Sequence, residues 1–62
     1  MTPKEMEKLI KADGWKLDHI KGSHHHYKHL KKLGIVTIPF HDRPKDLKQK
    51  TVASILKQAG LK

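Results

Sequence analysis

The chain has 62 residues, no cysteine, and a formal net charge of +8 from 14 Lys and Arg against 6 Asp and Glu. These numbers exclude a disulfide-stapled scaffold and a thiolate metal site, and no apolar run approaches the roughly 20 residues of a membrane span. Because the first residues also lack the apolar core of a secretory signal, we expect one cytoplasmic domain over residues 1–62. The excess positive charge predicts an anionic partner, with nucleic acid first and an acidic protein second.

The first segment predicts a helix that begins at Pro3. Thr2 supplies a hydroxyl N-cap and Glu5 follows three residues after it, which is the pattern of a capping box. The apolar residues that follow recur at i, i+3 and i+4 and form one stripe: Met6, Leu9 and Ile10. Gly14 is expected to end this helix in a left-handed conformation.

A β-hairpin is expected next. Residues 15–21 alternate partially between polar and apolar types, and the Gly-Ser pair at 22–23 is a two-residue turn signal before a second strand over residues 24–30. A strict two-residue turn would put the apolar residues of the first strand on both faces of the sheet. Either that strand carries a bulge between Leu17 and Ile20, or the loop is longer than two residues.

The third strand is the β-branched run at 35–38, stopped by Pro39 after a turn at 31–34. A second helix is expected to open at Asp42 or between Pro44 and Asp46 and to end at Gly60. Its apolar residues at helical spacing are Leu47, Val52, Ile55, Leu56 and Ala59. The predicted fold class is therefore α+β, in the order α-β-β-β-α, with a three-stranded antiparallel sheet and two helices on one face.

The segment GSHHHYKH from Gly22 to His29 carries the chemistry of this sequence, because it holds four of the six histidines beside the hairpin turn. Between His19 and Lys32 there are four lysines, five histidines and no carboxylate. Imidazole is the side chain whose unperturbed pKa lies near neutrality, so a cluster held by a turn can move protons at cellular pH. The segment is the candidate active site.

Several features together resemble the HicA family of toxin ribonucleases. They are Gly14-Trp15 before the first strand, the GSHHHYKH turn, Thr37-Ile38-Pro39 at the end of the third strand, and SILKQAGL at 54–61. The resemblance covers essentially the whole chain, although Leu30 stands where relatives often have proline. It implies a fold similar to the double-stranded RNA-binding domain, cleavage of mRNA independently of the ribosome, neutralisation by a HicB antitoxin, and catalysis by the histidine of the Gly-Ser-His motif, here His24.

The residues themselves are compatible with ribonuclease chemistry. RNA carries its own nucleophile, the 2′-hydroxyl beside the scissile phosphate, so the enzyme must take one proton, give another and stabilise charge, without a metal or cofactor. We expect His24 to transfer a proton. The residues expected to bind RNA are Lys21, Ser23, His26, Lys28, Lys45, Lys48 and Lys50. The last three lysines could equally be a solvated helix face.

The remaining histidines are expected to have other roles. Strand alternation puts His24, His26 and Lys28 on one face and His25, Tyr27 and His29 on the other. We therefore expect His25 and His29 to be structural residues beside a buried Tyr27. His19 and His41 are expected to be ordinary surface residues, and Trp15 is expected in the core. Zinc binding is disfavoured because consecutive strand residues point to opposite faces.

Two classes of function stay open at this point. The first is a metal-independent endoribonuclease toxin, and the second is a non-catalytic module that uses the same basic face to bind duplex RNA by its shape. A DNA-binding module is less well supported, because the sequence has no recognition-helix motif. In either case we expect an acidic protein partner, an antitoxin, to cover the histidine turn and bury exposed apolar surface.

Overall fold

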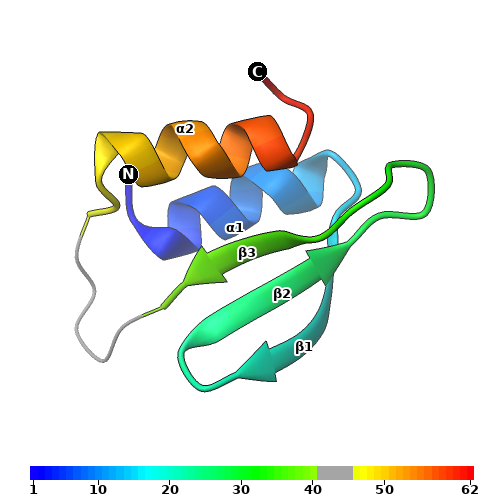
Figure 1. Cartoon of the computed structure of the whole chain (residues 1–62), viewed down its shortest axis with the longest axis horizontal. Helices are drawn as coiled ribbons and strands as arrows, with labels where there is room; N and C mark the ends of the chain where they lie inside the picture. The colour runs from blue at the N-terminus through cyan, green and yellow to red at the C-terminus, as the bar shows by residue number, and fades with distance from the viewer. Residues whose placement is uncertain (41–45) are drawn as a thin grey trace.

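The structure, a computed structural model, describes residues 1–40 and 46–62. Its elements are α1 (Pro3–Ala12), β1 (Lys16–Lys21), β2 (His24–Lys28), β3 (Val36–Pro39) and α2 (Gln49–Gln58). The strands form one antiparallel sheet in the order β1-β2-β3, and both helices lie on the same side of it (Figure 1). The predicted α-β-β-β-α order and α+β class are confirmed. Neither of the described helices is long and apolar enough to cross a membrane.

Helix α1 begins with the predicted capping box. The Thr2 hydroxyl accepts a hydrogen bond from the Glu5 N–H at 3.1 Å, and the Glu5 carboxylate accepts one from the Thr2 N–H at 2.8 Å. The hydrogen bond from the Thr2 backbone, aided by the hydroxyl, lowers the pKa of Glu5. Met6 and Ile10 are buried as the apolar stripe predicts, whereas Leu9 remains 41 % exposed at its edge. The stripe that contacts the sheet is therefore narrower than the sequence pattern suggests.

The β1–β2 hairpin has the two-residue turn that the sequence predicts. Lys21 pairs with His24 across the turn, so only Gly22 and Ser23 lie between the strands. Gly22 adopts a φ of +60°, which an L side chain rarely adopts, and it occupies the first central position. The alternative of a longer loop is therefore wrong.

A β-bulge in β1 resolves the conflict of faces in the sequence pattern. Leu17 pairs with Tyr27, and the next pair along the two strands is His19 with His26. Asp18 has no partner on β2 and is the extra residue of the bulge. Leu17 and Ile20 consequently face the same side of the sheet as Tyr27. The predicted bulge between Leu17 and Ile20 is confirmed. His19 lies on the turn side of the bulge, opposite His26, and faces away from the helices.

Strand β2 ends at Lys28, two residues before the expected end near Leu30. His29 leaves the strand because its Nδ1 accepts hydrogen bonds from the backbone N–H groups of Lys31 and Lys32, at 2.9 and 3.2 Å. These bonds use the imidazole to close the β2–β3 connection. The backbone pairing of β2 stops here, because the His29 side chain accepts the hydrogen bonds of these two backbone N–H groups.

Helix α2 begins at Gln49, so the expected opening at Asp42 or between Pro44 and Asp46 is wrong. Lys48 is the N-cap, because its backbone is extended, with φ −66° and ψ 149°. Residues 41–45 lie outside the part of the chain that the structure describes.

Leu47 precedes α2 instead of lying within it. Its backbone N–H donates a hydrogen bond to the Met1 carbonyl at 2.6 Å, and its side chain packs against the core. The apolar side chain of Leu47 is therefore explained by its packing against the core and not by a place in the apolar stripe of α2.

The core lies between the inner face of the sheet and the two helices. Its buried members are Met6, Ile10, Trp15, Tyr27, Val36, Ile38, Ile55 and Ala59. The predicted place of Trp15 in the core is confirmed, since this side chain is almost fully buried. Because these apolar groups come from both helices and from two strands, the core holds the two layers together.

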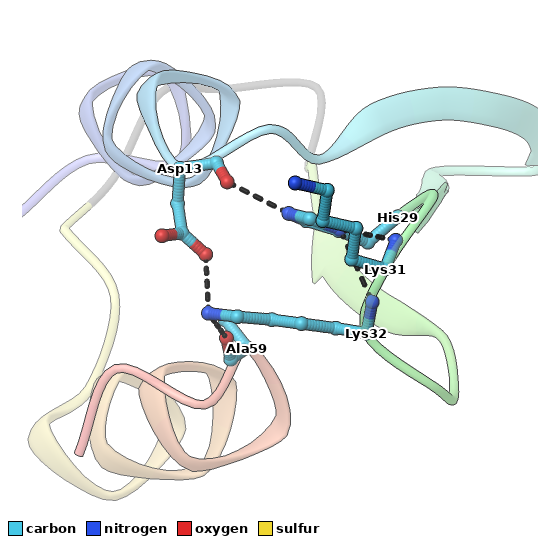
Figure 2. A network of polar contacts seen from close by, with 5 residues as sticks. All are labelled: Asp13, His29, Lys31, Lys32 and Ala59. Atoms are coloured by element: carbon cyan, nitrogen blue, oxygen red, sulfur yellow. Dashed lines mark hydrogen bonds and ion pairs between the residues drawn. The ribbon is translucent and has the colours of Figure 1, made fainter.

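The β2–β3 connection ties the ends of both helices together (Figure 2). Lys32 Nζ lies 2.5 Å from Asp13 Oδ2, at the end of α1, and donates to the Ala59 carbonyl at 3.0 Å, at the end of α2. Because His29 Nδ1 accepts from two backbone N–H groups, its Nε2 carries the hydrogen and donates to the Asp13 carbonyl at 2.7 Å. A cation therefore occupies the negative ends of two helix dipoles at once.

Candidate active site

The candidate site lies on the face of the sheet that points away from the helices, which we call the outer face. His24, His26 and Lys28 alternate along β2 with the buried Tyr27, which faces the core. The cross-strand register puts Lys21 of β1 directly opposite His24. Four sequence-predicted site residues, Lys21, His24, His26 and Lys28, therefore lie on adjoining positions of two strands.

His24 is the first residue of β2 and its side chain is exposed. It follows the tight turn formed by Gly22 and Ser23, where a Cβ added to the glycine would meet no atom within 4 Å. This open surface lets a phosphodiester approach both the imidazole and the turn backbone. An accessible ring beside an ammonium group has the composition needed for proton transfer on a phosphate ester.

His26 is held more firmly than His24. Its Nδ1 lies 2.9 Å from the Thr37 hydroxyl oxygen on β3, and its ring is half-buried. Loss of solvent lowers the pKa of His26, and the positive charges of His19, His24 and Lys21 add to that effect. The neutral imidazole is therefore the dominant form of His26 at neutral pH.

His19 belongs to this cluster, which sequence reasoning missed. Its ring stacks on His26 with centroids 4.5 Å apart and planes 15° from parallel. Its Nδ1 lies 2.7 Å from Asp18 Oδ2, and this hydrogen bond lowers the pKa of Asp18, with a further effect from the nearby Lys28 ammonium. His19 lies at the surface as expected, with its side chain 50% exposed, and these two ring contacts are what the sequence did not predict. The available signal was the two-residue turn, because once Lys21 pairs with His24, His19 lies opposite His26 on the outer face.

The other two histidines of the GSHHHYKH segment, His25 and His29, pack against aromatic side chains of the fold. His25 stacks on Phe40 with ring centroids 3.9 Å apart, and its Nδ1 is 4.0 Å from Glu7 Oε2. His29 packs edge-on against Trp15 at 5.3 Å. Both histidines therefore have structural contacts, and His29 packs on Trp15 after leaving the strand that carries Tyr27.

The lysines near the second helix are separate from the histidine cluster. Lys48 and Lys50 lie at the start of α2, whereas Lys45 and His41 fall outside the described residues. Figure 1 shows that the start of α2 and the β1–β2 turn lie toward the same end of the molecule, in different layers. One ligand would have to extend over that end to touch both.

Within residues 1–40 and 46–62, no three His, Cys, Asp or Glu side chains are grouped so that they could hold a metal ion. Three outer-face imidazoles are nevertheless close together, and two of them already have partners in Thr37 and Asp18. The arrangement offers proton donors and acceptors among fixed positive charges. These are the groups that phosphoryl transfer to an internal hydroxyl requires.

Comparison with known proteins identifies relatives of this chain. A family model described as the HicA toxin of bacterial toxin-antitoxin systems matches residues 3–61. One chain of a solved structure, a toxin-antitoxin complex from Streptococcus pneumoniae, is 39% identical, with a TM-score of 0.82 and coverage of 98% of both chains. Comparison with curated proteins found no match.

Proposed function

This chain belongs to the HicA toxin family, and from that membership we propose that the toxin is an endoribonuclease that cleaves mRNA and so inhibits translation. The observation that supports this proposal best is the exposed His24 ring at the β1–β2 turn, on a sheet face that also carries Lys21 and Lys28. The cleavage needs no metal ion or cofactor. Both mRNA and the proposed partner are found in the cytoplasm, where the toxin would act.

The proposed reaction uses the nucleophile that RNA supplies. His24 exchanges a proton with the substrate as a general acid or base while the 2′-oxygen attacks the adjacent phosphorus. The ammonium groups of Lys21 and Lys28 stabilise the negative charge that accumulates on the phosphoryl oxygens. Ser23 contributes a hydroxyl to phosphate binding, and His26 supports the site as a neutral neighbour.

The lysines at the start of α2 extend the proposed RNA-binding surface. Lys48 and Lys50 are exposed residues at the start of α2. Figure 1 shows that this end of the helix and the β1–β2 turn lie toward the same end of the molecule. A duplex or folded RNA that spans this end would meet both groups, as the resemblance to the double-stranded RNA-binding fold implies. Lys45, also expected to bind RNA, lies outside the described residues.

His24→Ala tests catalysis directly. Purified wild-type protein is incubated with a defined transcript in EDTA, fragment ends are mapped, and RNA binding is measured separately by fluorescence anisotropy. We expect the wild type to cut and His24→Ala to bind within a few-fold of wild type but to lose at least about 10²-fold in cleavage rate. If the wild-type protein binds RNA but yields no fragments, the proposed ribonuclease activity is wrong and the chain is a non-catalytic RNA-binding module.

We also propose a HicB-type antitoxin as the protein partner. Leu30 and Leu33 in the β2–β3 connection are 91 % and 96 % exposed, and Leu17 and Ile20 of β1 are about half exposed. Apolar side chains this accessible are typical of surfaces that a partner covers, and the basic outer face favours a partner with acidic groups.

Titration calorimetry with the product of an adjacent acidic open reading frame tests this partner. We expect tight binding, with an affinity that falls as salt is added, because the attraction between opposite charges is screened. Leu33→Ser should weaken the complex by about tenfold or more without changing RNA cleavage by the free toxin. Absence of heat or of a complex in gel filtration would contradict the assignment.

A further inference from the structure

We infer that His19 is a second catalytic residue, which gives a proton to the leaving 5′-oxygen while His24 takes the proton from the 2′-hydroxyl. This inference rests on the proposed ribonuclease function and names the missing partner in its chemistry. Cleavage by an internal hydroxyl needs one proton acceptor and one proton donor on opposite sides of the phosphorus. His24 alone supplies one of them.

The Asp18–His19 pair has the geometry of an oriented proton donor. The carboxylate oxygen lies 2.7 Å from Nδ1, so it accepts the hydrogen on that nitrogen and leaves Nε2 for exchange with a substrate. The lowered pKa of Asp18 keeps the carboxylate charged, so it remains a counter-ion for an imidazolium. The His19 side chain is 50% exposed, so RNA can reach it.

His26 holds the His19 ring from the other side. The stacked rings are 4.5 Å apart, and the Thr37 hydroxyl restrains His26 through its Nδ1. Because the pKa of His26 is lowered, its ring adds no second positive charge beside His19 at neutral pH. We therefore assign His26 as a positioning residue for His19, and Asp18 as the other.

The two proposed catalytic histidines are spaced to flank one phosphodiester. His19 lies opposite His26 and Lys21 lies opposite His24, which makes His19 and His24 diagonal neighbours on adjacent strands. Diagonal positions on one face of an antiparallel pair are about 7–8 Å apart. A phosphate fits between imidazoles at that separation, with the Lys21 ammonium beside it.

The step balances without any further reactant. The bond between the 2′-oxygen and phosphorus forms as the bond between phosphorus and the 5′-oxygen breaks. His24 gains the proton of the 2′-hydroxyl, and His19 loses a proton to the 5′-oxygen. Nothing is oxidised or reduced, and the product ends are a 2′,3′-cyclic phosphate and a 5′-hydroxyl.

An RNA with sulfur in place of the bridging 5′-oxygen at a mapped cleavage site separates the two roles, because a thiolate leaves without a proton. We expect His19→Ala to slow cleavage of ordinary RNA by at least about 10²-fold and of the sulfur-containing RNA by less than about tenfold. His24→Ala should cleave both RNAs much more slowly than the wild type, because the 2′-hydroxyl must still lose its proton. Asp18→Asn should follow the pattern of His19→Ala more weakly, and Lys8→Ala on the exposed side of α1 is the matched control, expected to cleave both RNAs like the wild type.

The outcomes distinguish the inference from the function on which it rests. Wild-type protein that cleaves neither RNA removes the proposed function, and this inference with it. If the wild type cleaves and His19→Ala cleaves ordinary RNA equally well, or loses both RNAs to the same extent, the inference alone is overturned. Circular dichroism melts of every variant show whether a loss of cleavage comes from unfolding. If His19→Ala does not fold, His19→Gln replaces it.

Discussion

The ammonium nitrogen of Lys32 lies 2.5 Å from Asp13 Oδ2, so a residue of the β2–β3 connection binds the end of α1 (Figure 2). The same nitrogen donates to the Ala59 carbonyl at the end of α2. One side chain therefore joins the sheet to both helices at the end of the molecule opposite the candidate site. In a chain with no disulfide, such a contact restrains the arrangement of the two layers.

Replacing Lys32 tests this restraint. Lys32→Met is expected to lower the melting temperature by several degrees at pH 7, because it leaves the Asp13 carboxylate and the helix ends without their cation. Lys31→Met, a neighbouring exposed lysine, is the control and should melt like the wild type. Equal melting of both variants would contradict the proposed restraint.

The pH dependence of that difference follows from Asp13. The hydrogen bond from Lys32 lowers the pKa of Asp13 below its usual 3.8, so the folded protein binds this proton less readily than the unfolded chain. The stabilisation is present above about pH 3.8 and disappears as the pH falls through the lowered value. Thermal melts of wild type and Lys32→Met should therefore converge at low pH.

Two glycines with positive φ are expected to differ in their tolerance of a side chain. Gly22 has a φ of +60° and open space around its Cβ position, whereas a Cβ on Gly14 (φ +107°) would lie 2.7 Å from His29 Nε2. Gly22→Ala should cost about 1 kcal/mol, from backbone strain alone. Gly14→Ala should cost at least about 2 kcal/mol, because it also disturbs the bond from His29 to Asp13. Urea unfolding of the two variants measures the difference, and equal costs would contradict it.

The Tyr27 hydroxyl is a buried donor to Glu7, and burial raises its pKa, so it stays protonated at neutral pH. Tyr27→Phe is expected to reduce the free energy of unfolding by about 1–3 kcal/mol, because the carboxylate loses its donor. Glu7→Gln keeps an amide oxygen as acceptor and should cost less. A Tyr27→Phe variant as stable as wild type in chemical denaturation would show that the bond contributes nothing net.

His26 should titrate below 6.5, since loss of solvent and neighbouring positive charges lower its pKa. The unfolded chain then binds the proton more readily, so the contribution of His26 to stability is complete above about pH 6.5 and falls as the pH drops toward the folded pKa. NMR titration of the ring protons measures the shift. In His26→Gln, the loss of stability below pH 6.5 should be smaller than in wild type.

The lysines at the start of α2 are tested by charge reversal. If Lys48 and Lys50 bind phosphates, the double variant Lys48→Glu/Lys50→Glu should weaken RNA binding by about tenfold or more and reduce the salt dependence of the binding constant. Lys57→Glu at the other end of α2 is the matched control. Binding unchanged in the double variant would identify these lysines as a solvated helix face.

Much of the architecture is local in origin and could be predicted from the sequence. The capping box at Thr2 and Glu5 starts α1 through contacts only three residues apart, and Gly22 at the turn permits the hairpin. Alternation along β2 then separates His24 from the buried Tyr27. Each of these features depends on neighbours in the chain, so residue type and spacing suffice to identify them.

The start of α2 and the exit of His29 from β2 depend on contacts that are distant in sequence. Leu47 packs against the core and bonds to Met1, so the helix begins only after it. His29 meets Trp15 and Asp13, from the other side of the hairpin. Propensity is a weak preference that such tertiary contacts override.

By itself, the sequence determined the kinds of chemistry present: imidazoles at a glycine turn, surrounded by lysines, in an α-β-β-β-α chain. Only the tertiary structure decided which imidazoles meet. The turn at Gly22 and Ser23 pairs Lys21 with His24 and so sets His19 against His26, and the bulge at Asp18 moves Leu17 opposite Tyr27. A shift of one residue turns a side chain to the other face of a sheet, and strand pairing decides between the two faces.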